Sequence, residues 1–192
     1  MHVKFVTDCL SNKMKEYLDE NVYVVRNFLS YEELSILLEE SHEPSGWEIR
    51  GGDKNPMQNV WNKFIEGTNK IIFYKDGGIF NKIESLMNTD MIKYKKAYVL
   101  QKMTEMPVEE KTALFWHYEN KNNHLVAGSF VLYLNDDFEG GELVFKNNDI
   151  LVKPEANMFV FIPAGEDYTH SVNSHQGNDR LTYYGVSFYE QN

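Results

Sequence analysis

Cysteine and positive charge are both scarce in this 192-residue chain. Cys9 is the single cysteine, so no disulfide can form within the chain, and we expect a reducing, cytoplasmic location. It has no neighbouring histidine, which favours a structural or incidental role over that of a nucleophile. The chain has 19 Lys and Arg residues against 29 Asp and Glu, a net charge of -10. This balance disfavours nucleic acids and anionic membranes as partners, because both attract clustered positive charge.

Long apolar runs and secretion signals are also missing. No uninterrupted apolar stretch approaches the ~20 residues that a membrane-spanning helix requires, so we expect no membrane association. The N-terminal residues lack the apolar core and small-residue cleavage site of a signal peptide. With 42% hydrophobic and 14% aromatic residues and no linker or repeat, the sequence predicts a single globular domain over 1–192. No pattern specifies an oligomeric state.

The first half of the chain, mainly residues 1–92, is predicted to be helical support. Ser30 is followed by Glu33 three residues later, a capping-box pattern that predicts an amphipathic helix. Apolar residues at helical spacing predict further helices beginning near Pro56 and near Gly77. The remaining elements expected here are a short polar helix over 10–20 and an apolar strand over 21–29.

The second half, about 93–190, changes character. Seven or eight short β-branched and aromatic segments follow one another, separated by Gly, Pro, Asn and Asp. Helices followed by closely spaced strands predict a mainly β fold with flanking helices, built as a sandwich or small barrel. A jelly-roll core is the simplest architecture that fits.

Three residues in this β-rich half could hold a metal ion. His117 and Glu119 are separated by one residue, so on a strand both side chains point to the same face. His170 lies near the start of a later strand. Two imidazoles and one carboxylate leave three positions open on a metal, which suits non-haem Fe(II) enzymes that bind a cosubstrate and O2. Taken alone, a His-x-Glu pair is more often a solvated polar edge, and only the ordered combination favours a metal.

Arg180 is a second notable position, because it opens an otherwise apolar and aromatic strand. Only two other arginines occur in the chain. A desolvated guanidinium is costly when unpaired, and a carboxylate ligand held by two hydrogen bonds would be a suitable partner. The alternative is a strand-edge residue paired with a nearby acid such as Asp179.

The order of these elements resembles that of the Fe(II)/2-oxoglutarate-dependent dioxygenases, and within them the prolyl 4-hydroxylase-like branch. That branch shows His-x-Asp-Asn, a YLN strand, an acidic stretch and GGE, then a second His and an Arg. The corresponding residues here are HYEN at 117–120, YLN at 133–135, DDFE at 136–139 and GGE at 140–142, followed by His170 and Arg180. The strand-then-helix segment from 21 to 40 also resembles the opening of this branch.

The resemblance implies a double-stranded β-helix, a cupin-like jelly roll with its site at the open mouth. It implies Fe(II), 2-oxoglutarate and O2 as cofactor and cosubstrates, and it admits ascorbate. His117, Glu119 and His170 stand where the family has its metal-binding, catalytic residues. Arg180 and Tyr133 stand where the family binds the distal carboxylate of 2-oxoglutarate.

The implied reaction is hydroxylation of a substrate C–H bond, with release of succinate and CO2. A prolyl residue in a peptide or protein is the leading substrate, and a free amino acid or another small molecule is the alternative. Nucleic-acid dealkylation is disfavoured: the segment from Arg180 resembles the last strand of such demethylases, but their second arginine is missing.

Glu119 departs from the family, which carries Asp at this position. The extra methylene adds roughly 1.5 Å of reach to a ligand whose metal bond must be ~2.0–2.2 Å. We expect Glu119 to bind the metal, with His124 and Asp167 as weaker substitutes. Two competing hypotheses remain: a jelly roll that binds metal and 2-oxoglutarate with impaired turnover, and a cupin-like zinc or structural protein.

A second departure precedes the first histidine, where the branch has a Tyr-x-x-Gly turn whose tyrosine touches the cosubstrate. The sequence here has no such turn. Tyr98 or Lys102 could take the place of the missing tyrosine. For Trp116 and Trp61, core packing is favoured over a position at the mouth of the site.

Overall fold

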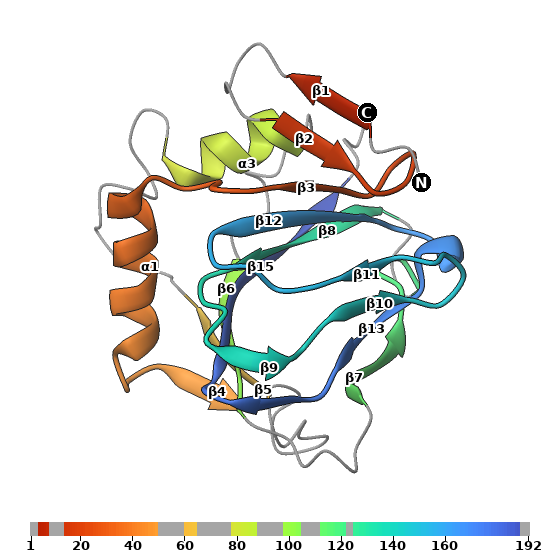
Figure 1. Ribbon diagram of the computed structural model, residues 1–192. Coiled ribbons are helices and arrows are strands. Elements are labelled where there is room, and N and C mark those ends of the chain that lie inside the picture. The colour runs from red at the N-terminus through yellow and green to blue at the C-terminus, as the bar shows by residue number, and fades with distance from the viewer. Residues whose placement is uncertain are drawn as a thin grey trace.

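Two antiparallel β-sheets packed face to face form the body of the protein (Figure 1). The structure is a computed structural model that describes residues 4–7, 14–49, 60–64, 78–87, 98–104, 112–121 and 125–188. Cys9 lies outside these ranges. None of the helices within them is long and apolar enough to cross a membrane.

The larger sheet has the strand order β1-β2-β3-β12-β8-β15-β6-β5-β4, and the smaller one β11-β10-β13-β7. The strands of the larger sheet are β1 (Lys4–Thr7), β2 (Met14–Tyr17), β3 (Tyr23–Val25), β12 (Met158–Pro163), β8 (Val126–Tyr133), β15 (Arg180–Phe188), β6 (Tyr98–Met103), β5 (Val60–Phe64) and β4 (Trp47–Ile49). Those of the smaller sheet are β11 (Leu151–Val152), β10 (Leu143–Phe145), β13 (His170–Asn173) and β7 (Thr112–His117). A separate pair joins β9 (Phe138–Gly140) to β14 (His175–Gly177). The helices are α1 (Tyr31–His42), α3 (Ile79–Met87) and the 3-10 turn η3 (Glu166–Tyr168).

The larger sheet has two apolar faces, as its period-two pattern requires. On β12, Met158 and Val160 point between the sheets, while Phe159 points to the opposite face. The inner face meets apolar residues of the smaller sheet such as Leu143 and Val172. The outer face is covered by α1 and α3, which lie on that side of the sheet in Figure 1. Burial on both faces therefore makes this sheet the centre of the fold.

Helix α1 begins where the capping-box pattern predicts. The Ser30 hydroxyl accepts a hydrogen bond from the Glu33 N–H at 3.3 Å, and the Glu33 carboxylate accepts one from the Ser30 N–H at 2.8 Å. Glu33 also forms an ion pair with Lys82 of α3. Leu37 is fully buried against the sheet. The cap thus fixes both the start of α1 and its contact with α3.

The prediction of a helix-rich first half was wrong for the described residues. The segment expected as a polar helix over 10–20 contains β2, which pairs with β1 and β3. The segment expected as a helix from Pro56 contains β5, which pairs with β4 and β6. Short helices are marginal on their own, so backbone pairing with a neighbouring strand overrides a weak helical pattern. The strand predicted over 21–29 and the helix predicted after Gly77 are confirmed as β3 and α3.

Asn157 fixes the loop before α1 to the start of β12. Its side chain accepts a hydrogen bond from the Leu29 N–H at 2.7 Å and donates one to the Leu29 carbonyl at 2.8 Å. Its backbone lies in the left-handed region, with φ of 62°. Asn157→Ala loses both bonds and strains the backbone, so we expect it to lower the free energy of unfolding by about 2–3 kcal/mol. Chemical denaturation measures this change.

The control for that prediction is Asn147→Ala, because Asn147 is exposed and its side chain donates one bond, to the Glu166 carbonyl at 3.1 Å. We expect a loss below about 1 kcal/mol for this variant. Equal losses of unfolding free energy for the two variants would contradict a specific stabilising role of the two Asn157 side-chain hydrogen bonds.

Candidate active site

His117, Glu119 and His170 meet at one end of the space between the sheets. His117 ends β7 and His170 begins β13, and the two are register partners, so their ring centroids lie 4.4 Å apart. Glu119 follows two residues after the end of β7. Its Oε1 lies 3.9 Å from His117 Nε2 and 3.8 Å from His170 Nε2. Among the described residues this trio is the group of His, Cys, Asp or Glu side chains whose ligand atoms converge, all within 4.8 Å.

His170 is held in the form that can bind a metal. The residue is 3% exposed, and its Nδ1 lies 2.9 Å from the Tyr168 carbonyl oxygen. The carbonyl can only accept, so Nδ1 carries the proton and Nε2 keeps its lone pair toward Glu119. Burial, together with the charge of His117, lowers the pKa of His170 to about 4. The imidazole is therefore neutral at neutral pH, as a metal ligand must be.

The two oxygens of Glu119 have different surroundings. Oε2 accepts a hydrogen bond from the Tyr184 hydroxyl at 3.2 Å. Oε1 is buried, and no described residue donates a hydrogen bond to it. A buried carboxylate oxygen without a partner is costly, which a cation at this point would relieve.

The two distances from the Glu119 carboxylate to the imidazoles also fit one metal ion. With bonds of ~2.0–2.2 Å, two atoms bound to the same ion lie at most roughly 4.4 Å apart. The separations of 3.8 and 3.9 Å from Glu119 Oε1 fall inside this limit. The extra methylene of Glu119 therefore does not keep its carboxylate away from the imidazoles.

Arg180 lies nearby on β15, buried and without an anionic partner among the described residues. It is 2% exposed; its Nη1 is 3.4 Å from the Met103 sulfur, and its guanidinium stacks 4.9 Å from the ring centre of Tyr133. Within the described part of the chain, no carboxylate pairs with it, Asp179 included, and its Nε has no acceptor. The hydroxyls of Tyr133 and of its neighbour Thr182 are also buried, and they have no hydrogen-bond partner among the described residues. Together these polar groups would suit an anion.

One cavity joins the trio to Arg180. Besides the trio and Arg180, its walls include Gln101, Tyr184 and the apolar side chains of Val131, Leu143, Ile162 and Val172. The three candidate metal ligands and the buried guanidinium therefore face one space that is bordered by apolar side chains.

Strand register explains why these polar groups converge. Arg180, Thr182 and Tyr184 are alternate residues of β15, so their side chains share its inner face. Thr182 pairs with Gln101 on β6 and with Tyr133 on β8, which extends the polar row across three strands. Sequence reasoning singled out Arg180 and Tyr133 but missed Gln101, Thr182 and Tyr184. The sequence signal for Thr182 and Tyr184 was their position two and four residues after Arg180, which places them on the same face of the strand as the arginine.

Several other predicted neighbours lie elsewhere. The Lys102 ammonium lies 4.9 Å from the ring centre of Trp47, and Lys102 does not line the cavity. Gln101 takes the inner position on β6 instead, while the side chain of Tyr98 is outside the described set. Trp116 is 46% exposed, so the core-packing interpretation was wrong, and Trp61 is half-buried on β5.

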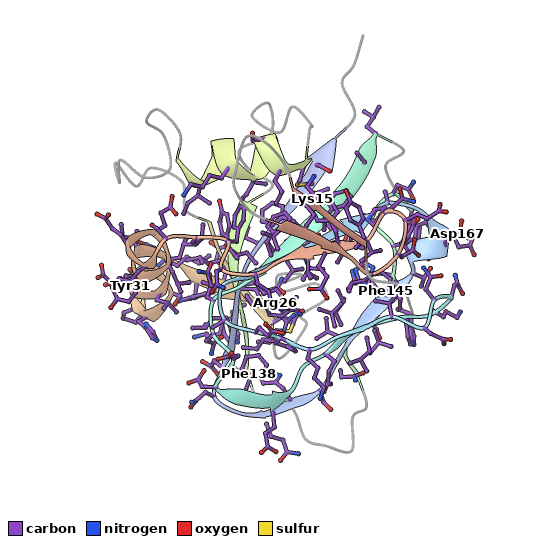
Figure 2. The ribbon with its side chains drawn as sticks, turned by 45° about the horizontal axis from the view of Figure 1, so that its top comes forward. Lys15, Arg26, Tyr31, Phe138, Phe145 and Asp167 are labelled. Carbon is purple, nitrogen blue, oxygen red and sulfur yellow. The ribbon has the colours of Figure 1, made fainter. Side chains whose placement is uncertain are left out.

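The two substitute ligands for Glu119 do not join the trio. Asp167 is exposed on η3 at the periphery of the molecule (Figure 2). His124 falls outside the described residues. Glu119 is thus the carboxylate that the described structure brings to the two imidazoles.

Gly140 and Gly141 allow the β9 segment to pack against Arg180. Both have positive φ, 85° and 69°. A Cβ on Gly140 would lie 2.5 Å from the Ser174 carbonyl oxygen. One on Gly141 would lie 3.0 Å from the Phe138 ring and 3.3 Å from Arg180 Cδ. The pair of glycines is therefore explained by backbone conformation and by the close approach of neighbouring atoms.

Residues 100–186 match the family model of the 2OG-Fe(II) oxygenase superfamily. This segment contains the trio, Tyr133 and Arg180. Over this segment, which carries the candidate site, the chain matches the 2OG-Fe(II) oxygenase superfamily. Fe(II), 2-oxoglutarate and O2 are accordingly its metal cofactor and cosubstrates, and the His–Glu–His trio offers suitable ligand types for the iron.

Solved structures of prolyl hydroxylases share the fold of this oxygenase. A Pseudomonas putida prolyl-4-hydroxylase has a TM-score of 0.62 at 16% identity, over 88% of this chain and 93% of that one. A Trichoplax adhaerens prolyl hydroxylase, in complex with a hypoxia inducible factor peptide fragment, has a TM-score of 0.60 at 14% identity, over 88% and 83%. The viral collagen prolyl hydroxylase of Paramecium Bursaria Chlorella virus-1 has 0.58 at 14% identity, over 90% and 97%.

A search of curated proteins gave no match. The structural similarity nevertheless confirms the predicted double-stranded β-helix, the fold that these prolyl hydroxylases have.

Proposed function

We propose that this oxygenase hydroxylates a prolyl residue in a peptide or protein. One oxygen atom of O2 enters the substrate as a hydroxyl group, and the other enters succinate as 2-oxoglutarate loses CO2. The observation that supports oxygenase turnover is the shared cavity, with the His–Glu–His trio and Arg180 on its walls. The prolyl preference is supported by the prolyl hydroxylases with the same fold, one of which has a peptide fragment bound.

In this proposal, His117, Glu119 and His170 hold the iron. His170 presents Nε2 because its Nδ1–H donates to the Tyr168 carbonyl, and Glu119 contributes the negative charge of the site. Fe(II), when bound, supplies the activation of O2 and the oxidation of the C–H bond.

Arg180 and Tyr133 bind the distal carboxylate of 2-oxoglutarate. The guanidinium offers parallel N–H donors, and the Tyr133 hydroxyl offers one more from the adjoining strand β8. Thr182, which is register-paired with Tyr133, adds a third donor on the same inner face. The apolar walls exclude water from the reacting groups, which strengthens these bonds.

The glycine at 141 provides a test of this carboxylate site. We expect Gly141→Ala to weaken 2-oxoglutarate binding by about 10-fold, because the added methyl pushes on Arg180 Cδ at 3.3 Å. Calorimetric titration with the cosubstrate measures the effect. Gly177→Ala is the control: its φ is also positive, 95°, but its nearest neighbour would be 3.8 Å away and is not Arg180. Equal weakening by both variants would mean that strain alone is responsible.

The proposed reaction is tested with purified protein, Fe(II), 2-oxoglutarate and air. Succinate is quantified, and the mass of each candidate substrate is followed for a gain of one oxygen. The panel pairs Pro-containing peptides with matched peptides carrying Ala in place of Pro, and adds free proline and other amino acids. His170→Ala is the inactive control. We expect succinate and product in equal amounts, and only with the Pro-containing peptides.

Other outcomes identify the competing functions. Turnover with free amino acids, and not with any peptide, would show that the substrate is a small molecule. Binding of Fe(II) and 2-oxoglutarate without succinate across the panel would indicate a binding protein with impaired turnover. Tight zinc binding that is independent of 2-oxoglutarate would indicate a cupin-like zinc protein.

A further inference from the structure

Tyr184 connects the metal trio to the opposite sheet. Its hydroxyl donates a hydrogen bond to Glu119 Oε2 at 3.2 Å, across 65 residues of sequence. Glu119 follows β7 of the smaller sheet, whereas Tyr184 lies in β15 of the larger one. The bond therefore spans the sandwich beside the cavity that both residues line.

A glutamate at this position needs such a contact more than an aspartate would. The extra methylene adds a rotatable bond, so the carboxylate can turn either oxygen, or both, toward a metal. Both oxygens on the ion would occupy one of the three positions that 2-oxoglutarate and O2 require. The hydrogen bond at Oε2 leaves Oε1 directed at the imidazoles, 3.8 and 3.9 Å from their Nε2 atoms.

The length of the tyrosine side chain matches this task. Position 184 is on the inner face of β15, two residues beyond Thr182, and its register partners are Val99 and Val131. Neither valine can hydrogen-bond to the carboxylate. A phenol at position 184 reaches across the interior to the end of β7, and its ring is partly buried on the way.

We propose that Tyr184 is a positioning residue that holds Glu119 as a one-oxygen ligand and so compensates for its extra methylene. The inference rests on the proposed metal-binding role of His117, Glu119 and His170. It makes Glu119 and Tyr184 a matched pair: the tyrosine hydroxyl is useful only when the carboxylate is long enough to meet it.

The test is a double-mutant cycle on metal affinity, with Co(II) alone as the probe. Titrations of its visible absorption give dissociation constants for wild type, Tyr184→Phe, Glu119→Asp and the double variant. We expect Tyr184→Phe to weaken Co(II) binding about 10-fold, the usual cost of losing a hydrogen bond to a metal ligand. In the Glu119→Asp background, where the shorter carboxylate ends before the phenol, it should change the affinity less than about twofold.

Tyr183→Phe is the matched control, because Tyr183 is the preceding residue on β15, is fully buried and packs in the outer core. It should leave Co(II) affinity unchanged. Thermal melts of all variants show whether folding is intact. A change in stability alone would act equally in the wild-type and Glu119→Asp backgrounds.

Three results would overturn the role of Tyr184. They are unchanged Co(II) affinity in Tyr184→Phe, an equal loss in the two backgrounds, and an equal loss in Tyr183→Phe. If wild-type Co(II) binding is insensitive to His170→Ala, the metal centre itself is wrong, and the role of Tyr184 is rejected with it. His170 dependence without Tyr184 dependence rejects the positioning role alone.

Discussion

Arg180→Met is expected to weaken 2-oxoglutarate binding by at least about 30-fold while Co(II) binding stays within about twofold of wild type. Removing one partner of a buried, hydrogen-bonded charge pair costs about 2–5 kcal/mol, or about 30-fold to more than 1,000-fold in affinity. Arg180 is 2% exposed, so water cannot replace the lost contact. Calorimetric titration of 2-oxoglutarate into the Co(II)-loaded protein measures the loss. Wild-type affinity for 2-oxoglutarate in Arg180→Met would show that Arg180 does not bind the cosubstrate carboxylate.

The same substitution should raise the stability of the ligand-free protein. The guanidinium is buried without an anionic partner among the described residues, and methionine fills a similar length without the desolvation cost. Wild type should melt at a higher temperature when 2-oxoglutarate is added, and Arg180→Met should not. Arg26→Met is the control, because Arg26 is a half-exposed arginine that pairs with Glu155 at 2.9 Å on the surface. It should leave the response to 2-oxoglutarate intact.

Glu119→Ala is expected to remove succinate formation and to weaken Co(II) binding by at least about 100-fold. The substitution deletes the single anionic side chain that the described structure brings to the two imidazoles. Glu119→Asp should retain part of both activities, because a carboxylate remains but loses its contact with Tyr184. Succinate assays and Co(II) titrations on the same samples separate loss of metal from loss of turnover.

Glu142→Ala is the control for this variant. Glu142 carries the same charge and bonds to the Asn173 side chain at 3.1 Å, away from the trio. Its removal should leave Co(II) affinity unchanged. Wild-type turnover in Glu119→Ala would show that Glu119 is not the carboxylate ligand of the metal. Asp167→Ala would then be the next variant to measure.

The residue pattern predicted the second half of the fold better than the first. The strands from β8 onward alternate or run apolar between clear turn residues, so their period could be recognised, and the capping box marked the start of α1 correctly. The segments that became β2 and β5 are short, and their strand conformation depends on pairing with neighbours. That pairing is not visible in a local pattern, because one of the two partners of β5, strand β6, lies more than 30 residues away.

The candidate site was only partly predicted, because some of its residues are brought together by strand pairing that a local pattern does not show. The spacing of His117 and Glu119 and the position of Arg180 are local features that the family pattern marks. Gln101 and Tyr184 became visible only when the register of β6, β15 and β8 placed them on one face. The hydrogen bond that we propose to position Glu119 comes from a tyrosine 65 residues away. The sequence around Glu119 does not contain that information.

The positions of β7 and β15 in their sheets have a consequence for the timing of amide hydrogen exchange. Strand β15 is hydrogen-bonded along most of its length to both β8 and β6, whereas β7 ends the smaller sheet, and its pairing with β13 is irregular (Figure 1). Amides of β15 should exchange last and those of β7 early. The pocket for the cosubstrate carboxylate would then be preformed, while the strand that carries His117 opens repeatedly. Loading the metal should slow exchange at β7, because the ion would join His117 at the end of this edge strand to His170 on β13.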